Sequence, residues 1–213
     1  MSDNHFIITI SREFCSGGQR VAAKLAADLG VKMYDEDLLS KASEESGISK
    51  ELFESHDEKP TNSFLYSLVM DTYSFNYAGN AYSEMPINQQ IFLAQFETIK
   101  KIAAKESCVI LGRCADYALE EMEECTTVFL CADYEDRLAF ASEHFGLSTQ
   151  QAKERIKKED KSRSSYYNFY TDKKWGSAAG YDLCLNTSAL GIDGTAEMIE
   201  AYVTKRYNIL YKC

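Results

Sequence analysis

The chain has 213 residues, 45% of them hydrophobic and 26% charged, so it can bury a core and is not typical of a disordered protein. Its formal net charge of -10 argues against a protein that mainly coats nucleic acid, because such affinity comes from Lys and Arg side chains that neutralise phosphates. Several cysteines lie in apolar runs and none forms a C-x-x-C pair, which favours a reducing compartment. The amino terminus has no basic region and no long apolar run, so we expect a cytoplasmic protein without signal peptide or membrane span.

Short apolar runs alternate with helical patterns along the chain. The runs that predict strands are Phe6–Ile10, Val31–Tyr34, Ser107–Leu111, Thr126–Cys131 and Tyr181–Leu185. The segments whose spacing predicts helices are 21–29, 37–59 (two short helices), the run after Pro86, 133–143, the run opened by the Ser148 and Gln151 capping pair, and 195–205. The alternation predicts βαβ units, and hence an α/β fold with a parallel sheet flanked by helices. With only two prolines and no linker composition, we expect a single domain over residues 1–213.

A turn rich in serine and glycine follows the first predicted strand. Between Ile10 and the next helix stands the sequence SREFCSGGQR, which is residues 11–20. Glycines let backbone N–H groups approach an oxyanion, and the start of a helix adds favourable partial charge. The turn lacks the lysine of the G-x-x-x-x-G-K-[ST] motif. Its local pattern therefore leaves open a phosphate loop and a plain turn between strand and helix.

Ordered motifs over nearly the whole chain resemble the cytidylate-kinase-like proteins, relatives of bacterial cytidylate kinase. The matching segments are Ile8–Gly18, Phe129–Arg137, Ile156–Arg163, Asp182–Ser188 and Gly191–Asp193. The resemblance implies a P-loop NTPase fold of the nucleoside monophosphate kinase type, with an inserted helical acceptor segment at about 45–105 and a small lid at about 150–178. It also implies ATP-dependent phosphoryl transfer to a nucleoside monophosphate, CMP or dCMP first, with ATP and Mg²⁺ as cofactors. Nucleotides are then the expected partners, and the oligomeric state is left open.

The same resemblance assigns residues to the site. Those expected to contact the cofactor are Cys15, Ser16, Gly17, Gly18, Gln19 and Arg20. Those expected to contact the acceptor are Asp35, Glu36, Lys41, Arg113, Asp160 and Arg163. Those expected to act in the transfer are Arg12, Arg20, Arg113 and Asp35. No protein ligand for a metal is predicted.

Two loop positions depart from the cytidylate kinase pattern. Gly18 stands where that enzyme has its loop lysine, and Arg12 stands where it has its first loop glycine. Phosphoryl transfer depends on positioning and charge stabilisation, so another cation must replace the lysine if catalysis is to be fast. The candidates are Arg12, Arg20 and Lys24. The alternative is a non-catalytic or regulatory nucleotide-binding protein on the kinase fold.

Several assigned residues have second interpretations. If Asp35 faces the acceptor, it favours a small-molecule or nucleoside kinase with a hydroxyl acceptor, since a hydroxyl benefits from a nearby base. The alternative is that Asp35 caps a helix beginning near Asp37. Asp160 and Arg163 have the spacing of an i,i+3 ion pair within a helix. Arg113 can also be a surface arginine that follows a tight turn. Cys15 is interpreted as filling a glycine position, although a helix start can lower a thiol pKa.

An aromatic run follows the basic residues of the predicted lid. Its members are Tyr166, Tyr167, Phe169, Tyr170 and Trp175. These rings can stack on a base, or they can pack a lid or a dimer contact, and we favour packing.

Overall fold

A parallel five-stranded sheet in the order β2-β3-β1-β4-β5 organises the chain. The computed structural model describes residues 5–35, 46–47, 51 and 86–207. Its strands are β1 (Ile7–Arg12), β2 (Lys32–Tyr34), β3 (Cys108–Leu111), β4 (Cys125–Cys131) and β5 (Leu183–Asn186). Its helices are α1 (Gly18–Leu29), α5 (Ile87–Ala103), α6 (Ala115–Ala118), α7 (Tyr134–Phe145), α8 (Thr149–Tyr170) and α9 (Thr187–Tyr207), with a 3₁₀ turn at Ala178–Gly180.

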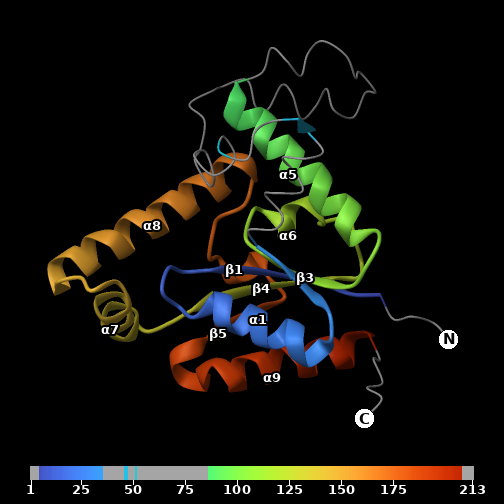
Figure 1. Cartoon of the computed structure of the whole chain (residues 1–213). Helices are drawn as coiled ribbons and strands as arrows, with labels where there is room; N and C mark the ends of the chain where they lie inside the picture. The colour runs from blue at the N-terminus through green and yellow to red at the C-terminus, as the bar shows by residue number, and fades with distance from the viewer. Residues whose placement is uncertain (1–4, 36–45, 48–50, 52–85, 208–213) are drawn as a thin grey trace.

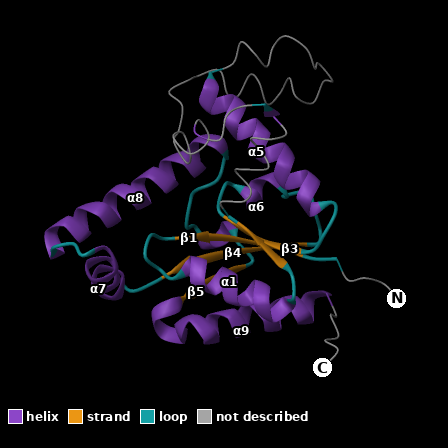
Figure 2. Ribbon diagram, viewed as in Figure 1, coloured by secondary structure: helices purple, strands orange, loops and turns teal. Residues whose placement is uncertain are grey.

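Both faces of the sheet are covered, as Figures 1 and 2 show. Ile8 and Ile10 of β1 pack into the core formed with α1 and α9 on one face. Ile7 packs into the core formed with α5 and α6 on the other face. These three side chains are at most 1% exposed, which explains why the strand reads as an unbroken apolar run. The predicted α/β fold with a covered parallel sheet is confirmed.

Helices α7 and α8 form a hairpin that projects from one side of the sheet (Figure 1). Ser148 caps α8: its Oγ accepts from Gln151 N–H at 3.4 Å, and Gln151 Oε1 accepts from Ser148 N–H at 2.9 Å. This is the predicted capping box. The hairpin buries Leu138 and Ala141 of α7 against α8. The predicted lid at about 150–178 begins in this hairpin, and its boundaries stay a prediction.

Other elements differ from the expectations or lie outside them. Helix α9 begins at Thr187, earlier than predicted, because four residues turn helically before a kink at Gly191 (φ 68°, ψ 178°). Helix α6 was not predicted, and the chain reaches it through left-handed backbone at Gly112, Arg113 and Cys114. The helices predicted at 37–59 lie largely outside the described residues, while α5 confirms the helix after Pro86. No helix in the described ranges is both long and apolar enough to cross a bilayer.

A buried hydrogen bond joins α6 to α8. Asp116 is 4% exposed and accepts a hydrogen bond of 2.6 Å from the Tyr167 hydroxyl. Burial raises the pKa of the Asp116 carboxyl, against the lowering effect of the hydrogen bond. The folded chain therefore holds a proton on this carboxyl more tightly than the unfolded chain does.

Replacement of this carboxyl is expected to change how stability depends on pH. Asp116→Asn keeps the acceptor oxygen without burying a charge, so it should raise the free energy of unfolding near neutral pH. A carboxyl with a raised pKa stabilises the fold fully below its unfolded pKa and loses that contribution as pH rises through its folded pKa. The gap between variant and wild type should therefore close as pH falls to about 4, the unfolded pKa of Asp.

Urea unfolding across this range measures the gap, and Asp136→Asn at an exposed position of α7 controls for net charge. A gap that does not change with pH would contradict the assignment of a raised pKa to Asp116.

Candidate functional site

The loop after β1 enters α1 through a tight turn. Gly17 is the N-cap of α1 with a left-handed φ of 76°. The Ser16 hydroxyl donates to the Glu13 carbonyl at 2.9 Å, and the Thr187 hydroxyl donates to the Ser16 carbonyl at 2.7 Å. The first N–H groups of a helix have no acceptor within it, so the start of α1 offers donors to an anion. Strand, glycine turn and helix start therefore occur together, as a phosphate loop requires.

Cys15 occupies a backbone position that suits glycine. Its φ is 62°, in the left-handed region that L side chains rarely adopt. Burial raises the pKa of its thiol to about 11, and the lowering influence of Arg137 is smaller. The thiol is thus protonated at neutral pH, which agrees with the filler interpretation and contradicts the lowered pKa considered from the sequence.

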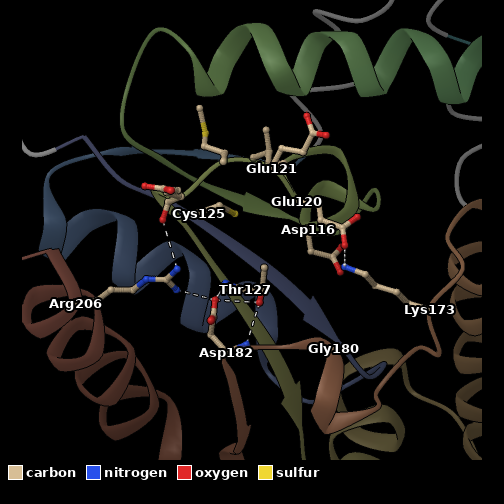
Figure 3. A pocket seen from close by; sticks show the side chains of 12 residues that line it. Asp116, Glu120, Glu121, Cys125, Thr127, Lys173, Gly180, Asp182 and Arg206 are labelled. Atoms are coloured by element: carbon tan, nitrogen blue, oxygen red, sulfur yellow. Dashed lines mark hydrogen bonds and ion pairs between the residues drawn. The ribbon is translucent and has the colours of Figure 1, made fainter. Parts of the chain in front are cut away.

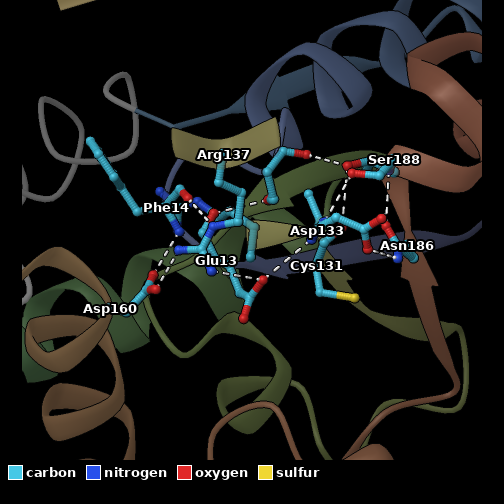
Figure 4. Close-up of polar contacts among 12 residues, drawn as sticks. Glu13, Phe14, Cys131, Asp133, Arg137, Asp160, Asn186 and Ser188 are labelled. Carbon is cyan, nitrogen blue, oxygen red and sulfur yellow. Dashed lines mark hydrogen bonds and ion pairs between the residues drawn. The ribbon is translucent and has the colours of Figure 1, made fainter. Parts of the chain in front are cut away.

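The α7–α8 hairpin holds the loop through one buried guanidinium, Arg137 of α7 (Figure 4). Arg137 Nε donates to the Phe14 carbonyl at 2.7 Å. Its terminal nitrogens pair with the Glu13 carboxylate at 3.0 Å and with the carboxylate of Asp160 on α8. Asp160 Oδ1 in turn accepts the Phe14 N–H at 2.8 Å. Both sides of the Phe14 backbone are therefore fixed by side chains of the α7–α8 hairpin, and the predicted contact of Asp160 with an acceptor stays a prediction.

Aromatic stacking adds a second connection between loop and hairpin. The Phe14 and Phe145 rings stack with centroids 5.8 Å apart and planes 12° apart. The Arg155 guanidinium lies 4.0 Å from the Phe145 ring centroid. Sequence analysis did not identify Glu13, Phe14 and Arg137 as functional candidates, and it assigned Asp160 a different role. The contacts of Phe14 with Asp160 and Arg137 join residues more than a hundred positions apart in the sequence. The only sequence signal for them is that these residues lie in the segments that resemble the family.

Three arginines line one small pocket at the carboxyl edge of the sheet. The pocket is formed by Ser11, Arg12, Gly112, Arg113, Cys114, Arg163, Tyr166, Tyr167 and Trp175. Arg12 ends β1, Arg113 follows β3, and Arg163 comes from α8, where its Nη1 donates to the Arg12 carbonyl at 3.2 Å. No carboxylate is among the described residues that form the pocket wall. The pocket is therefore cationic within a chain whose net charge is -10.

Asp35 lies beside this pocket, at the end of β2. Its carboxylate is 3.7 Å from Arg113 Nη2 and accepts a 3.3 Å hydrogen bond from Gln19. The Asp35 side chain is 13% exposed and that of Arg113 is 6% exposed. The parallel strands thus bring Arg12, Asp35 and Arg113 to one edge, as strand ends predict. The helix that Asp35 was considered to cap lies outside the described residues.

The remaining predicted residues divide into three cases. Arg20 is exposed on α1, and Lys24 pairs with Asp28 at 2.9 Å. Glu36 and Lys41 lie outside the described residues.

The aromatic run at the end of α8 packs the hairpin against α5. Tyr166, Tyr167 and Tyr170 are all at most 5% exposed. Tyr170 stacks on Phe92 of α5 with ring centroids 4.1 Å apart. Trp175 meets Phe129 edge to face at 5.2 Å. Packing, the favoured interpretation, therefore accounts for most of these rings, while some also form the wall of the cationic pocket.

A larger cavity of about 270 Å³ lies at the opposite, amino-terminal edge of β4 and β5 (Figure 3). Four of its charged side chains form two ion pairs: Asp182 with Arg206 at 2.9 Å, and Glu120 with Lys173 at 3.0 Å. Ligands of parallel sheets bind beyond the carboxyl ends of the strands, so the cavity is not the candidate site. In the described part of the chain, His, Cys, Asp and Glu side chains form no group of three or more that suits a metal ion.

Comparison with known proteins agrees with this geometry. The sequence profile of the cytidylate kinase-like family matches residues 7–189. An uncharacterised protein from Eubacterium ventriosum is 30% identical over 93% of this chain and 98% of its own, with a TM-score of 0.68. Shikimate kinase from Bacteroides thetaiotaomicron is 14% identical over 93% of this chain and 98% of its own, with a TM-score of 0.53, which is a likeness of fold. No curated protein matches the chain. The resemblance and the P-loop kinase fold predicted from the sequence are confirmed.

Removal of the buried guanidinium should loosen the loop and destabilise the fold. Arg137→Met leaves the carboxylates of Glu13 and Asp160 facing one another without their cation, at an expected cost of about 3 kcal/mol. Arg155→Met, on the same hairpin, removes only a guanidinium over a ring and should cost less than about 1 kcal/mol.

Urea unfolding gives both free energies, and hydrogen exchange reports the amides of the loop. Equal losses in the two variants, with unchanged exchange at Phe14, would show that Arg137 does not fix the loop.

Proposed function

The chain belongs to the cytidylate kinase-like family, and on that premise we propose that it transfers the γ-phosphoryl group of ATP to a nucleoside monophosphate, with CMP and dCMP as the first acceptors. The observation that carries the proposal is the cationic pocket, where Arg113 and Arg163 lie together with Arg12, whose side chain packs against Gly18 at the start of α1. Phosphoryl transfer needs little covalent chemistry from the protein and much positioning and charge stabilisation. Three guanidiniums of this kind supply both.

The residues present fit the phosphates of ATP. The N–H groups at the start of α1, from Gly18 to Arg20, would hold phosphate oxygens beside the cationic side chain of Arg12. Mg²⁺ would arrive with the nucleotide, because it is usually held by substrate phosphates, waters and one or two carboxylates. When bound, it neutralises charge on the transferring group. Cys15 fits as a loop residue whose protonated thiol adds no charge.

The acceptor phosphate would bind at Arg113. Its guanidinium is nearly buried and pairs with Asp35 at 3.7 Å, and this pair would orient it to meet a phosphate with two parallel hydrogen bonds. Arg163 reaches the same pocket from α8 and bonds to the Arg12 carbonyl, which links the hairpin to the reacting groups. The rings of Tyr166 and Tyr167 form part of the wall and exclude water from it.

A hydroxyl acceptor is the second candidate, and the position of Asp35 favours it. The carboxylate lies beside Arg113 and Gln19 at the end of β2, where it would serve as a base for a hydroxyl group of an acceptor bound at Arg113. A third possibility, nucleotide binding without catalysis, follows from Gly18 at the position of the loop lysine.

An acceptor panel tests the kinase proposal. With ATP and Mg²⁺, ADP release is expected with CMP and dCMP, less with UMP, and least with nucleosides. Arg113→Lys should lower kcat/KM for CMP by about tenfold or more, because lysine cannot reproduce the bidentate guanidinium, while ATP affinity stays within about twofold. ATP binding without turnover of any acceptor would establish the non-catalytic alternative, and turnover of nucleosides alone would establish the hydroxyl acceptor.

Asp35→Asn separates the two kinds of acceptor. A phosphate acceptor is already anionic and needs no base, so the variant should keep kcat/KM for CMP within about tenfold of wild type. A hydroxyl acceptor would instead lose about a hundredfold or more. Steady-state ADP release with CMP and with nucleosides measures both quantities. A loss as large as this with CMP itself would contradict the proposal that a phosphate acceptor needs no base from Asp35.

A further inference from the structure

Gly18, the first residue of α1, has no room for a side chain. A Cβ atom at this position would lie 2.7 Å from the Cβ and 2.8 Å from the Cγ of Arg12. The backbone conformation of Gly18 does not require glycine, because its φ lies outside the left-handed region. Gly17, by contrast, has a left-handed φ of 76°. Only the space taken by Arg12 therefore requires glycine at position 18.

The root of the Arg12 side chain cannot yield this space. Arg12 is in register with Leu130 of β4, and its carbonyl accepts a hydrogen bond from Arg163. Of the two atoms that crowd Gly18, the Cβ of Arg12 moves only with the strand itself, while the Cγ moves only by a change of the χ1 rotamer. Arg12 and Arg113 both line the cationic pocket.

The other basic residues considered for the loop are placed less well. Arg20 is exposed, and Lys24 pairs with Asp28 at 2.9 Å and lies 3.8 Å from Asp193. Arg137 is near the loop, but Glu13 and Asp160 neutralise it. Arg12 is thus the candidate cation whose side chain stands directly over the start of α1.

We propose that Arg12 and Gly18 are a reciprocal pair, in which the cation that serves the β- and γ-phosphates of a nucleoside triphosphate stands at the end of β1 instead of at the start of α1. The inference rests on the proposed function, since it presumes a bound triphosphate. A side chain at position 12 excludes one at position 18, and the reverse. The arginine at position 12 and the absence of lysine at position 18 are therefore two parts of one change, in which the cation moves from one position to the other. A guanidinium also offers two parallel donors to a phosphate, where lysine offers a point charge.

A set of five variants tests the exchange. Arg12→Gly removes the cation, and glycine is needed because the Cβ of Arg12 is itself one of the crowding atoms. Gly18→Lys and Gly18→Ala place a side chain against an intact Arg12. The double variants R12G/G18K and R12G/G18A open the space and differ only in whether a cation enters it. Titration calorimetry with ATP and Mg²⁺ gives Kd, and urea unfolding reports the fold.

The pair predicts a distinct pattern. Arg12→Gly should weaken ATP binding by about tenfold or more, and both single changes at Gly18 should lower the midpoint of unfolding. R12G/G18A should regain the midpoint but not the affinity. R12G/G18K should regain both, with Kd within about threefold of wild type.

Two results would overturn the inference while the proposed function stands. The first result is that R12G/G18K binds ATP no more tightly than R12G/G18A. It would contradict the claim that a cation at position 18 can replace the one at position 12. The other is Gly18→Ala with unchanged midpoint and affinity, which would deny the crowding. A wild-type chain that binds no ATP would overturn the proposed function instead, and the inference with it.

Discussion

The guanidinium of Arg137 holds the glycine turn and the α7–α8 hairpin as one unit. It bonds to the Phe14 carbonyl and to the carboxylates of Glu13 and Asp160, and Asp160 takes the N–H of the same Phe14. Such a network is stable only when every member is satisfied, because each group is largely removed from water. The course of the loop from β1 to α1, and with it the place of every group near the glycine turn, depends on this contact.

The electrostatics of the site follow from that arrangement. Since two carboxylates neutralise Arg137, it adds little positive potential to the nearby pocket. The cationic character comes from Arg12, Arg113 and Arg163, each supplied by a different element. A chain with a net charge of -10 can therefore still present a local anion site, because low-dielectric walls concentrate the field of a few charges.

The hairpin has a structural role as well as a place in the site. Tyr170 packs on Phe92 of α5, and Tyr167 bonds to the buried Asp116 of α6. Arg163 on the same helix reaches the pocket and the end of β1. One helix thus connects the packing of the α5 side of the sheet to the residues proposed to bind phosphate, so a shift of α8 would alter both together.

The sequence alone determined the parallel sheet, the position of the glycine turn and the meeting of Arg12, Asp35 and Arg113, because unbroken apolar runs mark buried parallel strands and the carboxyl ends of such strands share an edge. It also determined the start of α8, since a capping box is a local pattern. Only the tertiary structure decided why Gly18 is glycine, because the atoms that crowd it belong to Arg12 across the turn. Likewise, the contact between Phe14 and Asp160 spans 146 residues, and no local pattern encodes which charged side chain meets which backbone group at that separation.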